Sequence, residues 1–251
     1  MNILITGATS GIGKQLALDY LADGHHVVAC GRTKAKLDAL AKDARGSGRL
    51  SYCIFDVTDR EQTLLALQEI AVNEGLQASG FDCVILSAGV CEYIDDAKNF
   101  EPALVDRVFA ANFFGVVNSI AGVLPNLKPG SKLVVVDSMA RMFQFTRAEA
   151  YGASKAAIHY FAGSLRTDLV KEGIQVITVS PGFVKTPMTD ANDFEMPMRV
   201  TVEQASRAIQ KGIAKGKPHI AFPRIFGGIL AFLQRLPYRL QISLSKRMKQ
   251  S

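Results

Sequence analysis

The sequence predicts an α/β protein with one domain, built on a doubly wound parallel sheet of seven strands. Short and nearly continuous apolar runs alternate with longer segments of helical periodicity, as expected when parallel strands are buried on both faces. A glycine-rich turn directly follows the first of these runs. With 251 residues, 48% of them hydrophobic and 21% charged, the chain can bury a substantial core.

Seven apolar runs are expected to form the strands, and six segments between them have the periodicity of helices. The predicted strands are Asn2–Thr6, His26–Cys30, Leu50–Phe55, Cys83–Ser87, Lys132–Val136, Gln175–Val179 and His219–Phe222. The predicted helices are Gly13–Leu21, Thr33–Ala44, Arg60–Asn73, Pro102–Leu124, Tyr151–Glu172 and Val202–Lys215. This alternation predicts right-handed crossovers between neighbouring parallel strands.

The charge is placed unevenly along the chain. The net charge is +6, and the segment 222–251 holds six basic residues and no acidic one. The preceding 221 residues carry 23 charges of each sign. We therefore expect a neutral domain over 1–223 and an apolar and basic extension over 224–251, and we expect no nucleic-acid partner.

The glycine-rich turn, Thr6 to Gly13, is typical of a dinucleotide site because it links a strand to a helix. Gly7 permits the tight turn, Gly11 lets the backbone approach a pyrophosphate, and Gly13 lets the helix pack closely on the strand. The free N–H groups at the start of that helix suit a phosphate, so Thr9, Ser10 and Ile12 are candidate contacts as well. The alternative interpretation is a structural turn.

The end of the second predicted strand favours NADP(H) over NAD(H). An NAD site usually offers a carboxylate there for the ribose 2′-hydroxyl, whereas this chain offers Arg32. A guanidinium suits a 2′-phosphate. A solvated charge at the strand end is the alternative.

Tyr151 and Lys155 form the candidate catalytic pair, because residues four apart lie on one face of a helix. A cation beside a phenol favours the tyrosinate, so we expect Lys155 to lower the pKa of Tyr151 from about 10. A phenol tuned in this way can donate or accept a proton. A surface tyrosine stacked on a lysine stem is the alternative.

Taken together, these motifs resemble those of the short-chain dehydrogenase/reductase family, which has a Rossmann-type fold, over at least residues 2–223. The resemblance implies a catalytic set of Asn112, Ser138, Tyr151 and Lys155. It implies cofactor contacts from the glycine turn, Asp56, Val57, Ala88, Gly89, Tyr151, Lys155, Pro181, Gly182, Val184 and Thr186. The sequence departs from the family pattern at Leu86 and Ser87, where two Asn usually stand.

The implied reaction interconverts a carbonyl and an alcohol, with Tyr151 as proton donor or acceptor and Ser138 orienting the oxygen. By analogy, Lys155 also holds the nicotinamide ribose, and Asn112 anchors a water in a proton relay. A non-catalytic dinucleotide-binding regulator and a membrane-recruited scaffold are the alternative functions. The family also implies a homodimer or homotetramer.

The segment Met188–Val200 is expected to cover the substrate, and Phe143 and Phe145 are expected to wall an apolar pocket. We therefore expect a lipophilic substrate. His159 and His219 show no partner pattern, the four cysteines fit reduced core positions, and no metal site is expected.

The extension joins an apolar stretch, Ile225–Leu236, to a basic one, Tyr238–Lys249, whose helical character is ambiguous. We expect no apolar run of the roughly 18 residues that a spanning helix needs. No signal peptide is recognised, so a cytoplasmic location is expected. Cations beside an apolar stretch suit peripheral contact with an anionic membrane at its inner face. Alternatively, the extension covers the pocket or forms a subunit interface.

Overall fold

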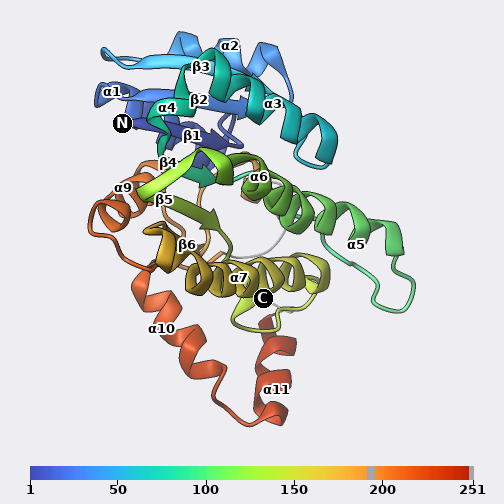
Figure 1. Cartoon of the computed structure of the whole chain (residues 1–251). Helices are drawn as coiled ribbons and strands as arrows, with labels where there is room; N and C mark the ends of the chain where they lie inside the picture. The colour runs from blue at the N-terminus through green and yellow to red at the C-terminus, as the bar shows by residue number, and fades with distance from the viewer. Residues whose placement is uncertain (191–195, 249–251) are drawn as a thin grey trace.

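The computed structural model describes residues 1–190 and 196–248, which form a seven-stranded parallel sheet with helices on both faces (Figure 1). The strand order is β3-β2-β1-β4-β5-β6-β7. The strands are β1 (Asn2–Thr6), β2 (His26–Gly31), β3 (Arg49–Ile54), β4 (Phe81–Leu86), β5 (Leu127–Val136), β6 (Gln175–Pro181) and β7 (His219–Phe222). The predicted sheet and its seven strands are confirmed.

Alternate residues of each strand enter different cores, because successive side chains point to opposite faces of a sheet. Ile3 and Ile5 of β1 pack in the core beneath the helices of one face, whereas Leu4 packs in the core of the other face. The first face is covered by α1 (Gly11–Ala22), α2 (Lys34–Asp43) and α9 (Val202–Ala214). The second is covered by α3 (Arg60–Asn73), α4 (Leu76–Ser79), α6 (Gly115–Val123) and α7 (Glu149–Leu169).

The predicted helix over 102–124 is not one regular helix. It comprises α5 (Pro102–Phe109), a π-helical turn η1 (Ala110–Phe114) and α6, followed by the 3-10 turn η2 (Leu124–Asn126). By length and composition alone, 102–126 is long and apolar enough to cross a membrane, so the expectation of no such run was wrong. Val116, Ile120 and Val123 of α6 are buried against the sheet, which makes this part a core helix of the domain.

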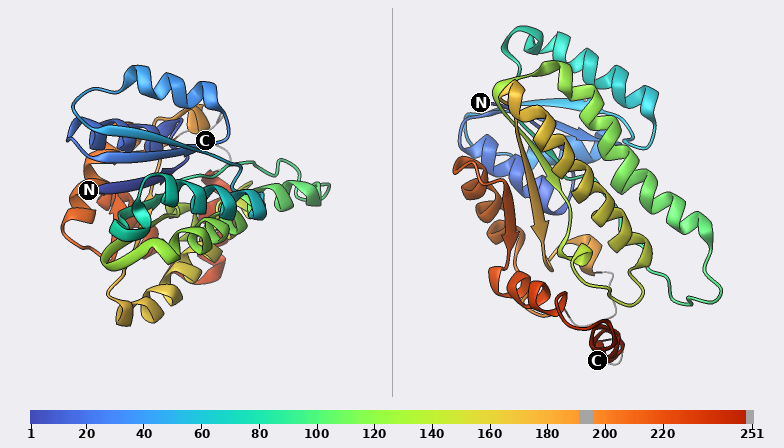
Figure 2. Two further views of the ribbon diagram at one scale, coloured as in Figure 1. Left: turned by 45° about the horizontal axis from the view of Figure 1, so that its top comes forward. Right: turned by 60° about the horizontal axis from the view of Figure 1, so that its bottom comes forward.

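The extension forms a helical hairpin of α10 (Arg224–Leu233) and α11 (Tyr238–Met248), which projects beneath the domain (Figures 1 and 2). The ambiguous basic stretch is thus helical. Leu244 packs with the apolar cluster around Met139, and Ser245 Oγ donates to Gln144 O at 2.5 Å. These tertiary contacts, absent from the local sequence pattern, hold α11 in place.

The sheet changes winding direction between β1 and β4. Ligands of doubly wound sheets bind at the carboxyl ends of the strands beside such a switch point. Here the chain after β1 meets the chain after β4, since Ser87 N and Ala88 N donate to Thr6 Oγ1 at 3.2 and 3.3 Å. The topology therefore puts the glycine turn at the place where a ligand site is expected.

Candidate functional site

The glycine turn after β1 has the backbone conformation that its sequence predicts. Gly7 and Gly11 adopt φ values of +69° and +52°, which side chains other than glycine rarely tolerate. A Cβ at Gly7 would lie 2.9 Å from Ala88 N, and one at Gly13 would lie 2.4 Å from Gly7 O. Glycine is therefore required at both positions for the strand, the turn and α1 to approach each other.

The N-terminus of α1 fits the pyrophosphate of a dinucleotide. The helix begins at Gly11, its first turn holds no acidic residue, and Ser10 makes no side-chain capping bond. The first N–H groups and the positive end of the helix dipole thus remain available to an anion. The glycines leave the backbone bare where a phosphate would approach.

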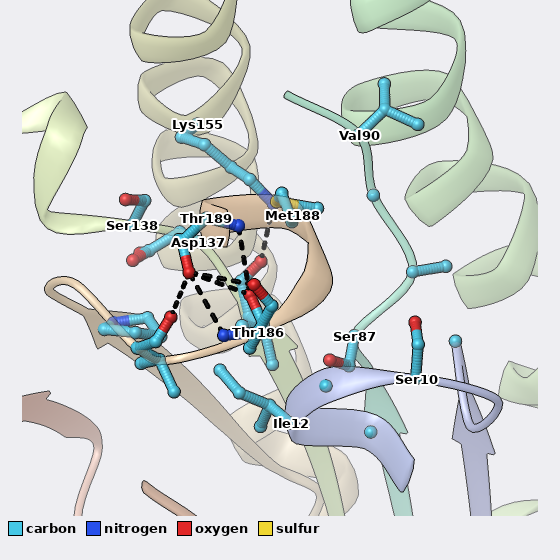
Figure 3. Close-up of a pocket in the computed structure, with 18 of the residues that line it drawn as sticks. Ser10, Ile12, Ser87, Val90, Asp137, Ser138, Lys155, Thr186, Met188 and Thr189 are labelled. Atoms are coloured by element: carbon cyan, nitrogen blue, oxygen red, sulfur yellow. Dashed lines mark hydrogen bonds between the residues drawn. The ribbon is translucent and has the colours of Figure 1, made fainter. Parts of the chain in front are cut away.

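A cavity that is partly open to solvent extends from this turn to α7 and the segment after β6 (Figure 3). Lys155 enters it from α7, while Ser10 and Ile12 lie on the glycine turn. The predicted site residues that line it are Gly7, Ser10, Gly11, Ile12, Gly13, Ala88, Gly89, Ser138, Tyr151, Lys155, Pro181, Gly182, Val184 and Thr186. The fold brings these positions from five segments of the chain into one cavity.

The segment after β6 closes one side of the cavity. It includes α8 (Pro187–Asp190), and Thr189 Oγ1 donates to Val184 O at 2.6 Å. Thr186 lies close to the glycine turn, since a Cβ at Gly11 would come within 3.1 Å of its methyl group. Met188 lines the cavity as predicted, whereas part of the predicted substrate cover, 191–195, lies outside the described residues.

Ser138, Tyr151 and Lys155 converge on the cavity from two elements. Ser138 directly follows β5, and the other two residues lie one turn apart on α7. The Ser138 side chain lies close enough to Tyr151 to lower the pKa of its hydroxyl in part. Lys155 Nζ donates to Val136 O at 3.1 Å and lies 5.8 Å from the centre of the Tyr151 ring.

The expected lowering of the Tyr151 pKa was wrong. Burial raises the pKa of Tyr151 well above its ordinary value, with a further increase from Cys91, and the Ser138 side chain opposes this only in part. Burial also lowers the pKa of Lys155 from 10.5 to about 8, against the opposing effects of Asp137 and Cys91. Desolvation thus shifts the pKa of Tyr151 and of Lys155 more strongly than the interaction between the two side chains does.

Asn112 lies in the π-helical turn and contacts the chain after β4. Its Oδ1 accepts from Val90 N at 2.8 Å, and its Nδ2 donates to Val90 O at 2.9 Å and Ser154 Oγ at 3.1 Å. The side chain is fully buried and joins the Gly89 loop to α7. Because π-helical turns often occur at functional sites, this departure from the predicted helix marks the site.

Arg32, Asp56, Val57 and Thr9 lie outside the cavity lining that the structure describes. Arg32 Nη1 lies 3.4 Å from Asp56 Oδ2, and the Arg32 side chain is 69% exposed. Partial burial works against ionisation of Asp56, but bonds from Thr58 and the Arg32 charge hold its pKa below the ordinary value. Thr9 lies beside Gly31, and Val57 packs against α6.

Sequence reasoning missed a buried polar cluster directly beside Ser138. Asp137 accepts a hydrogen bond from Ser180 Oγ, lies 2.5 Å from His159 Nδ1, and lies 3.3 Å from Arg141 Nε. The sequence pattern did not reveal Asp137 as the partner of His159. Its spacing of four residues from Lys155 could have placed it on the same face of α7.

Two further expectations change. Phe143 and Phe145 do not line this cavity but pack with Phe226 against α10. Cys91 is only partly buried and lies near Tyr151, unlike the three core cysteines, and all four are free thiols. Within residues 1–190 and 196–248, no group of three His, Cys, Asp or Glu side chains is arranged to hold a metal.

Comparisons with known proteins show the family to which the chain belongs. A family model described as short chain dehydrogenase matches residues 1–196. The chain is 34% identical over 223 residues to an uncharacterized oxidoreductase of Myxococcus xanthus, covering 88% of this chain and 86% of that protein. It is 30% identical to benzil reductase ((S)-benzoin forming) of Saccharomyces cerevisiae, covering 83% and 81%.

The fold is shared with a short chain dehydrogenase from Burkholderia cenocepacia that was crystallised in complex with NADP. The TM-score is 0.79 at 23% identity, with 98% of this chain and 96% of that chain covered. The family model and the sequence relatives together establish that this chain belongs to the short chain dehydrogenase family of oxidoreductases.

Proposed function

We propose that the chain is an NADP(H)-dependent oxidoreductase that interconverts a carbonyl and an alcohol on a lipophilic substrate. The observation that carries this proposal is the convergence of Ser138, Tyr151 and Lys155 on a cavity whose far side is the glycine turn. When bound, a nicotinamide cofactor supplies or accepts the hydride. The chain's own residues handle the proton and position the oxygen.

In the reductive direction, the Tyr151 hydroxyl donates its proton to the substrate oxygen as negative charge develops there. The phenol is protonated at neutral pH and so carries the proton that this step requires. The Ser138 hydroxyl lies beside Tyr151 and hydrogen-bonds the same oxygen, which orients it. With a pKa of about 8, Lys155 can exchange protons near neutral pH and so restore the phenol.

The glycine turn would hold the pyrophosphate of the cofactor, and Thr9, Asp56 and Val57 would contact its adenosine end. Val184 and Thr186, together with Pro181 and Gly182, would hold the nicotinamide end. Arg32 binds the 2′-phosphate: its exposed guanidinium lies at the carboxyl end of β2, and β2 itself has no carboxylate that would select a free ribose hydroxyl. The NADP in the Burkholderia structure lends support at the level of the fold.

Two observations support a lipophilic substrate. Met188, Val90 and Val184 give the cavity apolar contacts beside Ser138 and Tyr151. The yeast relative is named a reductase of benzil, an aromatic diketone. We expect lipophilic ketones to be better substrates than short polar ones.

Tyr151→Phe tests the chemistry. Its turnover, measured as NADPH oxidation with lipophilic ketones, should fall to background, while NADPH binding, measured by fluorescence, persists. Tyr160→Phe is the matched control, because Tyr160 lies on the same helix and is 79% exposed. Continued turnover by the Tyr151 variant would refute the mechanism, and a wild-type chain that binds NADPH but reduces no carbonyl would favour a non-catalytic regulator.

Arg32→Asp tests the cofactor preference. A carboxylate at this position repels a 2′-phosphate and accepts from a ribose hydroxyl, so kcat/KM should fall with NADPH and rise with NADH. Lys211→Asp, an exposed substitution on α9, is the control for the change in charge. Equal use of NADH and NADPH by the wild-type chain would overturn the assignment.

Association into a homodimer or homotetramer through α5, α6 and α7 is part of the same proposal. Phe114 beside α6 and Tyr160 on α7 are 51% and 79% exposed, which suits an aromatic subunit contact. Tyr160→Glu should lower the mass in light scattering. A monomeric mass for the wild type and for the Tyr160→Glu variant alike would contradict the proposed association.

A further inference from the structure

The outward face of α10 carries apolar side chains that the domain leaves uncovered. Ile225, Ile229 and Phe232 are 72%, 42% and 63% exposed. Their spacing of four and three residues puts them on one face of the helix. Gly228, which lies between them, has no neighbouring atom within 4 Å of the place where a Cβ would stand.

The opposite face of α10 is fixed to the domain. Phe226 and Leu230 are buried with Met139 and Phe143, and the ring centre of Phe226 lies 5.7 Å from that of Phe183. Gln241 Nε2 of α11 donates to Leu236 O at 2.8 Å and so braces the turn between the two helices. The exposed residues therefore cannot turn inward without breaking this packing.

Cations flank the apolar residues of α10 along the chain. Arg224 precedes Ile225, Arg235 lies one turn beyond Phe232, and Arg239 follows on α11; all three are exposed. Within the part of the chain that the structure describes, no carboxylate pairs with any of the three arginines. The hairpin thus combines an apolar stripe with uncompensated positive charge.

The combination of exposed apolar residues and exposed arginines favours a lipid surface over a second copy of the chain as the partner. In a twofold contact through the same surface, the arginines of one copy would approach those of the other, since residues 222–251 include no acidic side chain. An anionic lipid surface accepts both features, because its headgroups pair with arginine and its acyl region takes up the apolar residues. At ten residues, α10 is too short to span a bilayer and suits the interface plane.

We propose that the α10–α11 hairpin docks the enzyme on an anionic membrane surface, with Ile225, Ile229 and Phe232 inserted among the lipids. The hairpin adjoins the cavity lining through the buried face of α10, opposite the docking surface. Phe226 contacts Gly182, and Gly227 approaches Met139, which directly follows Ser138. If the proposed function holds, docking brings the enzyme to the lipid phase in which a lipophilic carbonyl dissolves.

Flotation of the full-length protein with vesicles tests the docking without any turnover. Phosphatidylcholine vesicles that contain phosphatidylglycerol should carry the protein upward, vesicles of phosphatidylcholine alone should carry little of it, and added KCl should weaken binding. Phe232→Glu should lower the partition coefficient at least about tenfold. Replacing Arg235 or Arg239 with Gln should lower it about fivefold for each cation.

Two further variants distinguish a loss of membrane binding from a loss of folding. Ile225→Glu places a carboxylate in the first turn of α10, where the helix dipole favours it, and should lose binding as Phe232→Glu does. Leu65→Glu makes the same change in charge at a 52% exposed apolar position on α3 and should bind like the wild type. Each variant should keep its thermal midpoint and its NADPH binding.

Three results would overturn the proposal. The first is a wild-type protein that floats equally with both vesicle compositions or with neither. The second is flotation of both glutamate variants at the wild-type level. The third is a lower mass in light scattering for both glutamate variants without any vesicle binding by the wild type, which would make the hairpin a subunit interface. Because no outcome depends on catalysis, failure of docking and failure of the proposed reaction remain distinguishable.

Discussion

Replacing Lys155 with methionine should stabilise the cofactor-free protein while abolishing its activity. The Lys155 side chain is nearly fully buried, and burial lowers its pKa from 10.5 to about 8. At neutral pH the ammonium is therefore held in a place that disfavours its charge. Methionine has a similar length and carries no charge, so the variant removes this cost with little change in packing.

The pKa change sets the size of the effect. A lowering from 10.5 to about 8 corresponds to about 3 kcal/mol of free energy at pH 7. Losing the hydrogen bond from Nζ to Val136 O offsets about 1 kcal/mol of this gain. The net stabilisation is about 2 kcal/mol, which for a chain of this size raises Tm by about 4–8 °C.

The pH dependence provides the sharper test. Below about pH 8 the folded and unfolded states both hold the Lys155 proton, so the wild type bears the full cost. Between about 8 and 10.5 the unfolded state binds more protons than the folded state, so wild-type stability rises with pH relative to the variant. The advantage of Lys155→Met should therefore be largest at pH 7 and shrink toward pH 10.

Thermal unfolding by circular dichroism at several pH values, without cofactor, measures this difference. Lys211→Met is the control, since Lys211 is exposed on α9 and should show no such advantage. The reasoning would be refuted if Lys155→Met melts below the wild type at pH 7, or if its advantage is the same at pH 7 and pH 10.

Three further substitutions test the site. Gly13→Ala places a Cβ 2.4 Å from Gly7 O, so NADPH binding measured by fluorescence should be lost and urea unfolding should show a loss of about 1–3 kcal/mol. Gly89→Ala brings a Cβ within 2.8 Å of Asn112 Oδ1 and should lower kcat about 10- to 100-fold in steady-state assays, with a smaller change in Tm. Asp137→Asn removes the charge that faces His159 and should destabilise the fold by about 3–5 kcal/mol in urea titration; an unchanged midpoint would show that this cluster contributes little.

The sequence predicted the sheet because its physical signals are local. Strands buried on both faces must be apolar throughout, and the glycines of the first turn are required by backbone approaches of less than 3 Å. The π-helical turn at Ala110–Phe114 could not be predicted in this way. It depends on the bonds from Asn112 to Val90 and Ser154, two partners that lie far from it in the sequence.

The pKa shifts of Tyr151 and Lys155 also could not be predicted from the sequence. The spacing of Tyr151 and Lys155 correctly places them one turn apart, but charge pairing alone suggested a lowered tyrosine pKa. Burial reverses that expectation, and burial is a property of the assembled fold.

By itself, the sequence determined the succession of strands and helices along the chain, the glycine-rich turn, the candidate catalytic residues and the cationic character of the extension. These features depend on residue type and short spacing. Only the tertiary structure decided that Asp137 contacts His159, that the side chains of Tyr151 and Lys155 are desolvated, and that α10 buries one apolar face and exposes the other. Each of these depends on contacts between segments far apart in the chain, which no local pattern records.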